Sequence, residues 1–253
     1  MEGSGTPVVL VHGFGEDSTI WDKQVKFLKD HCLVITPDIP GSGKSSILEG
    51  LSQAITLGDY AICIHALLLH EKIERCIILG HSMGGYITLA FEQLYPNMVS
   101  GFGFINSTVY PDTDEKKENR QRGIELMEKH GAYSFLKNTI PNLFSANFKE
   151  QHAEVVNELI EKARSFDTLA CQQYYTAMMN RPDRSGALKN TKVPVFIIAG
   201  TEDVAAPIKD VLEQSSLPTV AFIHVLENVG HMAMLEATEK VNQYILDFIS
   251  KVD

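Results

Sequence analysis

The sequence contains few cysteines, a minority of basic residues and no long hydrophobic run. Its four cysteines are scattered along 253 residues and form no C-x-x-C pair; they are Cys32, Cys63, Cys76 and Cys171. Three of them lie in apolar segments that are typical of strands or helices. We therefore expect buried free thiols in a reducing compartment rather than a disulfide framework.

Basic residues are outnumbered, since 22 Lys and Arg face 32 Asp and Glu, for a formal net charge of -10. This balance argues against nucleic acid or an anionic membrane surface as the main partner. No apolar run approaches the length that spans a bilayer. Residues 1–6 lack the basic stretch and apolar stretch of a signal peptide. We expect a soluble cytoplasmic protein.

Apolar, β-branched segments are plentiful, and 44% of the residues are hydrophobic, enough for a sizeable core in one large domain. Segments of this kind, separated by amphipathic helical patterns, predict an α/β fold with a mostly parallel sheet and right-handed crossovers. The predicted strands are residues 7–11, 33–36, 76–79, 101–105, 193–199 and about 220–226.

The pattern changes between residues 107 and 190, where no convincing strand is found and helical periodicities follow one another. We predict a helical cap, or lid, at residues 108–189, inserted over the ends of the strands. Residues 1–107 and 190–253 then form the core. Most of the aromatic residues of the insertion are expected to pack within it, and a few to face an apolar pocket.

One glycine-rich turn has the pattern G-x-S-x-G between a predicted strand and a predicted helix: Gly80-His81-Ser82-Met83-Gly84-Gly85. A serine at this nucleophile elbow projects from a strained bend, and glycines are needed where strand and helix nearly touch. The helix start behind Ser82 favours developing negative charge.

A second glycine-rich stretch follows the second predicted strand and ends in Gly43-Lys44-Ser45, as a phosphate-binding P-loop does. The first glycine of that motif is replaced by Asp38, and Pro40 also argues against a phosphate cradle. We predict a rigid surface turn in which Asp38 organises hydrogen bonds.

Three polar residues fall in loops after predicted strands, in the order Ser82, Asp203, His231. Such loops share one edge of a parallel sheet. A serine hydroxyl needs a base within reach, and the base needs an acid to orient it. We predict Ser82 as nucleophile, His231 as general base and then acid, and Asp203 as the orienting acid. Glu202 competes with Asp203, which fits the motif better.

An oxyanion hole needs two backbone N–H groups. We predict that of Met83, which follows the nucleophile, and that of Phe14, in the early loop His12-Gly13-Phe14-Gly15. These are backbone roles, so exchange of either side chain is expected to have a modest effect. His12 is expected to brace its loop, and the side chain of His81 to leave the bend in a different direction from Ser82.

Together these motifs resemble the α/β-hydrolase superfamily, most closely its single-domain, cap-bearing, esterase-like serine hydrolases. The resemblance covers nearly the whole chain and includes Asp38-x-Pro40-Gly41-x-Gly43-x-Ser45, Arg181-Pro182-Asp183, Gly200-x-x-Asp203 and Gly230-His231. It implies no metal and no organic cofactor. The family's sheet has eight strands, the first two of which precede the His-Gly strand. Only residues 1–6 precede that strand here, so we predict a shortened sheet of about six strands.

The predicted function is a serine hydrolase that cleaves a small, hydrophobic carboxylic ester through an acyl-enzyme. The same triad would serve a C–C bond hydrolase, a lactonase, a thioesterase or a perhydrolase, and the fold also serves non-enzymatic small-ligand receptors. A serine at the elbow disfavours epoxide hydrolases and haloalkane dehalogenases, which use a carboxylate there. We expect a small-molecule acyl substrate as partner, and a monomer or homodimer.

Overall fold

The computed structural model describes residues 1–49 and 54–252; residues 50–53 and 253 belong to the predicted core ranges but lie outside the described part. Its centre is a six-stranded sheet in the order β2-β1-β3-β4-β5-β6, in which every neighbouring pair is parallel. This confirms the shortened α/β sheet expected from the sequence. The strands are β1 (Pro7–Val11), β2 (Leu33–Ile35), β3 (Cys76–His81), β4 (Val99–Ile105), β5 (Val195–Gly200) and β6 (Ala221–Leu226).

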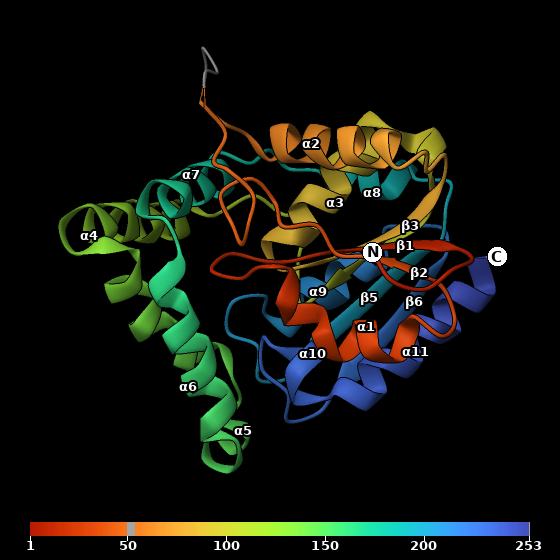
Figure 1. Cartoon of the computed structure of the whole chain (residues 1–253). Helices are drawn as coiled ribbons and strands as arrows, with labels where there is room; N and C mark the ends of the chain where they lie inside the picture. Colours follow the sequence, from red (N-terminus) through yellow and green to blue (C-terminus); the bar gives the residue numbers. More distant parts are fainter. Residues whose placement is uncertain (50–53, 253) are drawn as a thin grey trace.

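Helices cover both faces of the sheet, as the crossover connections between parallel strands require. In Figure 1, α2 and α3 lie on one side, and α1, α10 and α11 on the other. The helices of these layers, together with α9 beside β5, are α1 (Asp22–Leu28), α2 (Leu57–His70), α3 (Met83–Leu94), α9 (Ile208–Ser215), α10 (Ala233–Glu236) and α11 (Thr238–Val252).

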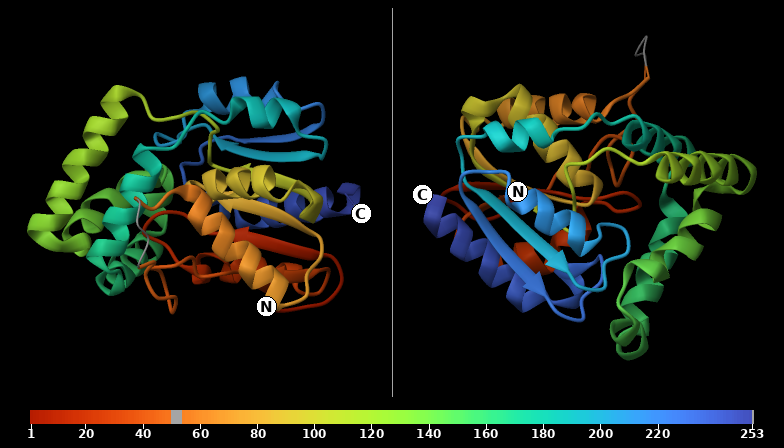
Figure 2. Two further views of the ribbon diagram at one scale, coloured as in Figure 1. Left: turned by 90° about the horizontal axis from the view of Figure 1, so that it is seen from above. Right: turned by 180° about the vertical axis from the view of Figure 1, so that it is seen from behind.

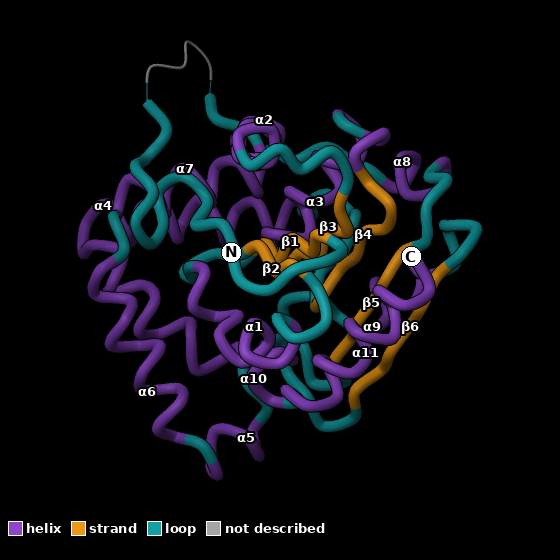
Figure 3. Tube along the Cα trace, turned by 45° about the vertical axis from the view of Figure 1, so that its right-hand side comes forward, coloured by secondary structure: helices purple, strands orange, loops and turns teal. Residues whose placement is uncertain are grey.

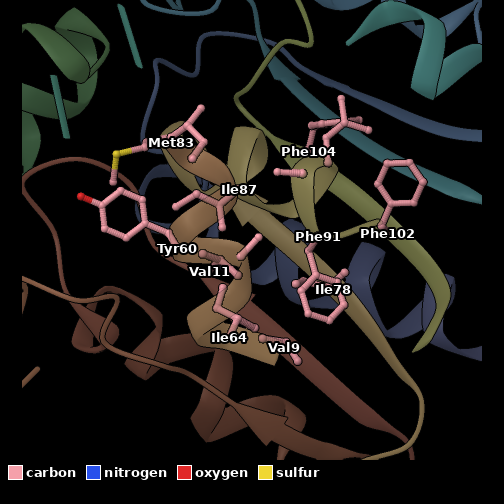
Figure 4. Close-up of a cluster of buried hydrophobic side chains, with 14 of the residues drawn as sticks. Val9, Val11, Tyr60, Ile64, Ile78, Met83, Ile87, Phe91, Phe102 and Phe104 are labelled. Carbon is pink, nitrogen blue, oxygen red and sulfur yellow. The ribbon is translucent and has the colours of Figure 1, made fainter. Parts of the chain in front are cut away.

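Two hydrophobic clusters fill the space between sheet and helices. Alternate residues of β1 belong to opposite clusters, with Val9 and Val11 in one and Val8 and Leu10 in the other, and all four are fully buried. This follows from the period of two along a strand. Figure 4 shows the first cluster, in which side chains from α2 and α3 meet those of the strands. The continuous apolar runs in the sequence therefore reflect strands buried on both faces.

The segment between β4 and β5 is entirely helical in its regular structure, and most of it stands beside the sheet (Figures 1 and 2). Figure 3 shows α4, α5, α6 and α7 grouped to one side of the strands, whereas α8 packs against α3. α4 contains one non-helical residue, Gly131, with φ 79°, where two helices meet at a kink. The five helices are α4 (Asp114–Thr139), α5 (Ala146–Gln151), α6 (Ala153–Lys162), α7 (Thr168–Met179) and α8 (Ser185–Asn190).

A buried carboxylate joins the two ends of this segment. Asp112 has a fully buried side chain that pairs with Arg120 of α4 and, at 2.8 Å, with Arg181 after α7. The guanidinium of Arg181 also lies 4.0 Å from the ring centroid of Tyr86, in α3. Burial raises the pKa of Asp112, but the two arginines outweigh it and hold the pKa below its ordinary value. The segment is thus anchored to α3 close to its start.

The four cysteines are free thiols, as expected. Cys32, Cys76 and Cys171 are buried, whereas Cys63 is half-buried. Burial raises the pKa of Cys76 and of Cys171 to about 12, which leaves both thiols protonated and unreactive. Among the helices of the described residues, none is both long and apolar enough to cross a lipid bilayer.

Candidate active site

Ser82 occupies a strained turn between β3 and α3. Its φ of 50° and ψ of -116° lie outside the regions that an L-residue normally adopts, at a cost of about 1–3 kcal/mol. Its backbone is tied to β4 and to the loop that follows: its N–H donates to the carbonyl of Ile105 at 3.1 Å, and its carbonyl accepts from the hydroxyl of Ser107 at 2.7 Å. The side chain is only partly buried.

Glycines allow this turn because backbone segments come very close there. A Cβ on Gly80 would lie 2.1 Å from the carbonyl oxygen of Gly84, and a Cβ on Gly84 would lie 2.3 Å from that of Val11. Neither contact is possible for a real side chain. The spacing of glycines around Ser82 in the sequence therefore has a steric cause.

The loop after β1 passes beside the elbow. A Cβ on Gly13 would lie only 3.2 Å from Cβ of Ser82, so the loop and the serine are in close contact. In the described part of the chain, no hydrogen bond uses the backbone N–H of Phe14 or of Met83. These are the two donors that the sequence predicted for an oxyanion hole.

The expectation that exchange of the Met83 side chain has a modest effect considers only its backbone role and leaves out its packing. That side chain is fully buried in the cluster that contains Tyr60 and Ile87 (Figure 4). Truncating it would leave a cavity under the elbow and cost about 2–5 kcal/mol of stability. The motif indicates what the Met83 backbone contributes, but it carries no information about what the side chain packs against.

Asp203 and His231 form a buried pair at the ends of β5 and β6. Nδ1 of His231 lies 2.8 Å from Oδ2 and 3.0 Å from Oδ1 of Asp203. Oδ1 also accepts from the backbone N–H groups of Ala205 and Ala206. With Nδ1 held as a donor, the lone pair of the neutral ring is on Nε2, and no hydrogen bond in the described part of the chain uses that atom or the Ser82 hydroxyl.

The pKa values of the pair move in opposite directions. Burial lowers the pKa of His231, but the Asp203 charge and hydrogen bond outweigh it and raise the pKa above 6.5. Burial raises the pKa of Asp203, yet His231 and the surrounding donors bring it below 3.8. Near neutral pH the aspartate is therefore ionised and stabilises a proton on the imidazole, which is what a general base requires.

The competitor, Glu202, is exposed, and its carboxylate accepts only from the backbone N–H of Ala146, at 3.4 Å. Of the two acids, Asp203 alone contacts His231. Asn106 is a residue that the sequence reasoning missed: its Nδ2 donates to Oδ2 of Asp203 at 3.0 Å and to the carbonyl of Gly230 at 3.1 Å. The sequence does indicate Asn106 weakly, because this residue directly follows β4 and so lies at the sheet edge that the other site loops share.

A second buried carboxylate–imidazole pair, also missed, lies beside the first. Glu16 contacts Nδ1 of His81 at 3.0 Å, and both side chains are almost fully buried. The rings of His81 and His231 have centroids 4.8 Å apart. The His81 side chain thus points toward the base loop, and its other ring nitrogen, Nε2, lies 2.9 Å from the carbonyl oxygen of His231.

The remaining glycine-rich turn has a structural role, as expected. Asp38 accepts from the N–H groups of Ser18 at 2.8 Å and Lys44 at 2.9 Å. Nε2 of His12 lies 2.8 Å from the hydroxyl of Ser42 and accepts from the N–H of Ile39 at 3.1 Å. All of these polar groups already have partners, so the turn is not a phosphate cradle.

The helical segment touches the site through the His231 loop. The N–H of His231 donates to the carbonyl of Leu143 at 2.7 Å. Glu236 accepts from the N–H groups of Gly230 and Ser145, each at 3.0 Å. Tyr175 of α7 contacts Phe14, with ring centroids 4.4 Å apart. These contacts place the segment directly over the loops that carry the candidate residues.

A cavity of about 80 Å³ lies between the segment and these loops. Its lining is mainly apolar and includes residues next to the candidate donors and base. The lining residues are Phe14, Gly15, Glu16, Leu136, Thr139, Ile140, Leu143, Leu159, Tyr175 and Met232. Among the described residues, no group of His, Cys, Asp or Glu side chains is arranged to hold a metal ion.

Known proteins of similar sequence are hydrolases and related proteins. The chain is 28% identical over 245 residues to the (E)-2-((N-methylformamido)methylene)succinate hydrolase of Acinetobacter baylyi, covering 96% of this chain and 89% of that protein. It is 29% identical to the dihydrolipoyllysine-residue acetyltransferase component of the acetoin cleaving system of Pseudomonas putida, covering 98% of this chain but only 64% of that relative.

Solved structures share the whole architecture. A thermophilic esterase from Thermogutta terrifontis, solved with malate bound, superposes with a TM-score of 0.93 at 29% identity, covering 99% of this chain and 92% of the esterase. The enol-lactonase of Burkholderia xenovorans LB400 gives 0.89 at 22% identity over 98% and 92% of the two chains, a likeness of fold alone.

A family model matches most of the chain. The model of the "Alpha/beta hydrolase family" matches residues 8–244, from the second residue of β1 to within α11. A match of this extent includes the sheet, the elbow and the loops that carry Asp203 and His231. The chain therefore belongs to the alpha/beta hydrolase family.

Proposed function

We propose that the protein is a serine hydrolase that cleaves a small, hydrophobic carboxylic ester through an acyl-enzyme. The observation that carries the proposal is the buried Asp203–His231 pair, whose imidazole has its ring centroid 4.8 Å from that of His81, the residue that precedes the strained, partly exposed Ser82. A structural histidine would have both ring nitrogens satisfied, whereas Nε2 of His231 takes part in no hydrogen bond of the described chain.

The reaction follows from these positions. The Ser82 hydroxyl attacks the ester carbonyl while Nε2 of His231 accepts its proton, and Asp203 stabilises the imidazolium that forms. The tetrahedral intermediate expels the alcohol, which takes the proton from His231. A water molecule, deprotonated by the same nitrogen, then attacks the acyl-enzyme and releases the carboxylic acid and Ser82.

The negative charge of both tetrahedral intermediates would be held by the backbone N–H groups of Phe14 and Met83. The lack of a competing partner for either group supports this role. The start of α3 behind Ser82 adds a favourable dipole. Loss of one such donor typically costs about 3–4 kcal/mol of transition-state stabilisation.

The cavity supports a short acyl group. An engineered apolar cavity of about 150 Å³ is large enough for benzene, and the cavity here has about 80 Å³. That volume admits a chain of a few carbon atoms. We propose that residues 108–189 are the cap, which closes this cavity through Leu136, Leu143 and Tyr175. The core is then residues 1–107 and 190–253.

Three of the reported names agree with hydrolysis but differ in substrate: an (N-methylformamido)methylene succinate hydrolase, an enol-lactonase and an esterase with malate bound. The fourth is an acetyltransferase component, which also transfers an acyl group. The apolar lining of the cavity favours an uncharged acyl group over an acidic one. An ester is therefore the preferred substrate, and a lactone is the nearest alternative.

The test is a panel of p-nitrophenyl acetate, butyrate and octanoate, with a matching thioester and a lactone, assayed on wild type and Ser82→Ala. We expect hydrolysis of the short esters, a preference for butyrate over octanoate, and loss of about 10⁴-fold or more in Ser82→Ala. Labelling of wild type by a fluorophosphonate, and not of Ser82→Ala, would place the nucleophile.

Two results would contradict the proposal. If wild type hydrolyses nothing in the panel and is not labelled, a binding protein on the same fold is favoured instead. If Ser82→Ala retains the wild-type rate, another residue is the nucleophile. Preference for the thioester or lactone over the ester would keep the mechanism and change the substrate class.

A further inference from the structure

The second carboxylate–imidazole pair connects three loops of the site. Glu16 belongs to the loop after β1, His81 is the last residue of β3, and His231 follows β6. The Glu16 carboxylate accepts from the N–H of Gly13 at 2.6 Å and from Nδ1 of His81 at 3.0 Å, and Nε2 of His81 donates to the carbonyl of His231 at 2.9 Å. This chain of hydrogen bonds passes beside Ser82, since a Cβ on Gly13 would lie 3.2 Å from Cβ of that serine.

Neither partner of the His81 ring can donate a hydrogen bond, because one is a carboxylate and the other a carbonyl oxygen. Each bond therefore needs a proton on the ring nitrogen that makes it. Burial raises the pKa of Glu16, but the charge and hydrogen bond of His81 outweigh it and lower the pKa below 4.5. The carboxylate is ionised and both side chains are almost fully buried, so the pair is costly to break.

We propose that Glu16 and His81 are positioning residues that hold the oxyanion loop and the base loop in register across the elbow. The Glu16 carboxylate orients the Gly13 peptide, and with it the N–H of Phe14 that follows. His81 holds the backbone of His231 while Asp203 holds its ring. The inference rests on the proposed function, because it assigns no chemistry to Glu16 or His81 themselves.

The close packing of the unit supports this role. A Cβ on Gly13 would lie 3.0 Å from Nδ1 of His81 and 3.1 Å from Oε2 of Glu16, tighter than most real contacts. The His81 ring also packs against the ring of His231, with centroids 4.8 Å apart. A shift of about 1 Å at a reacting centre can cost about 10²-fold in rate. Loss of the unit would therefore act on turnover more than on binding.

Two variants of Glu16 test the proposal with p-nitrophenyl butyrate as substrate, and a variant of another buried glutamate is the control. Glu16→Ala removes two of the three hydrogen bonds, and we expect kcat to fall by about 10²-fold with little change in KM. Glu16→Gln can still accept from Gly13, and its amide can donate to Nδ1 of a neutral His81, whose Nε2 keeps its bond to His231. We expect kcat of Glu16→Gln within about tenfold of wild type, since each bond survives in neutral form.

The matched control is Glu92→Ala. Glu92 is likewise a buried glutamate, 8% exposed, and its carboxylate accepts a hydrogen bond from Thr191 at 2.8 Å, but it lies ten residues beyond Ser82 in α3. We expect Glu92→Ala to lower the melting temperature and leave kcat unchanged. If Glu16→Ala does not fold, His81→Phe replaces it, since it removes both ring hydrogen bonds and keeps a planar side chain.

Wild-type turnover and labelling of Ser82 establish the proposed function independently of these variants. Given an active wild type, the inference is overturned by any of three results: Glu16→Ala with wild-type kcat, Glu16→Gln as impaired as Glu16→Ala, or Glu92→Ala with an equal loss of kcat. A selective loss in Glu16→Ala, restored by glutamine, supports it. The initial rate of fluorophosphonate labelling should follow the same order.

Discussion

Two buried carboxylate–imidazole pairs lie side by side in this protein, and they differ in what their ring nitrogens contact. His81 has both nitrogens engaged, one by Glu16 and one by a backbone carbonyl. His231 has one nitrogen engaged by Asp203, and no hydrogen bond in the described chain uses the other. Burial and a carboxylate partner on Nδ1 are common to both pairs, so neither property by itself identifies a general base.

The proposed assignment of His231 rather than His81 as the base therefore depends on the unused lone pair of Nε2. His81 is closer to Ser82 in sequence than His231 is, yet both of its ring nitrogens make hydrogen bonds that hold loops of the fold together. Both carboxylates are held ionised by their imidazoles, since the pKa of Glu16 and that of Asp203 are each lowered despite burial. The following variants separate the two pairs by experiment.

The largest expected effect is that of replacing the histidines. We expect His231→Ala to lower kcat/KM by about 10⁴–10⁶-fold, because it removes the base, and His81→Ala by about 10²-fold, because it only loosens the geometry. Steady-state kinetics with p-nitrophenyl butyrate measures both. Equal losses would show that the two imidazoles have the same role, and would contradict the assignment of His231 as base and His81 as positioning residue.

Next in size is the effect of neutralising the acids. We expect Asp203→Asn to lower kcat by about 10⁴-fold, since the amide favours the wrong tautomer of His231. Neutralising Glu16 to glutamine should have the much smaller effect given above. Circular dichroism on both variants would check that the fold persists. An Asp203→Asn enzyme with near-wild-type kcat would remove Asp203 from the mechanism.

The pH dependence of kcat/KM should reflect the pKa of His231 in the Asp203–His231 pair. His231 must be neutral to accept a proton, and its pKa is raised above 6.5 by Asp203. Activity should therefore be lost as the pH falls through this raised pKa, so that the acid limb of kcat/KM lies above pH 6.5. Assays from pH 5 to 9 at constant ionic strength would locate it. An acid limb well below 6.5 would mean that another group controls the rate.

The smallest effect is expected for the neighbour of Asp203. Glu202 is exposed and makes no contact with His231. Glu202→Gln should keep kcat/KM within about twofold of wild type, as surface substitutions usually do. A loss similar to that of Asp203→Asn would mean that the two acids exchange roles during turnover, and the comparison of the two pairs would have to be revised.

Much of the fold and the candidate site could be predicted from the sequence because the features that determine them involve residues close together in the chain. Apolar runs predict β1, β3, β4 and β5, since both faces of each of these strands are covered, whereas β6 at the edge of the sheet is partly exposed. The glycines around Ser82 have a steric requirement that depends only on the adjoining strand and helix. The order of Ser82, Asp203 and His231 requires only that loops after parallel strands share one edge.

The rest depends on contacts between residues far apart in the chain. Asn106 meets Asp203 across 97 positions, and His81 meets the His231 backbone across 150. No spacing rule predicts such contacts. The motif position of Met83 predicts only the role of its backbone N–H. The contribution of its side chain to stability comes from the hydrophobic cluster in which it is buried. Glu16 gave a weak indication, as an acid in an otherwise glycine-rich and apolar loop.

The bond between the His231 amide and the Leu143 carbonyl has a consequence for how this protein can evolve. Leu143 also lines the cavity, so a residue that shapes the proposed substrate space is joined by a backbone hydrogen bond to the proposed general base. Changes that enlarge or reshape the cavity from this side will also displace the imidazole. Selectivity at this wall and catalytic rate are therefore coupled traits, and new specificities are more readily reached from the α6 side, where Leu159 lines the cavity.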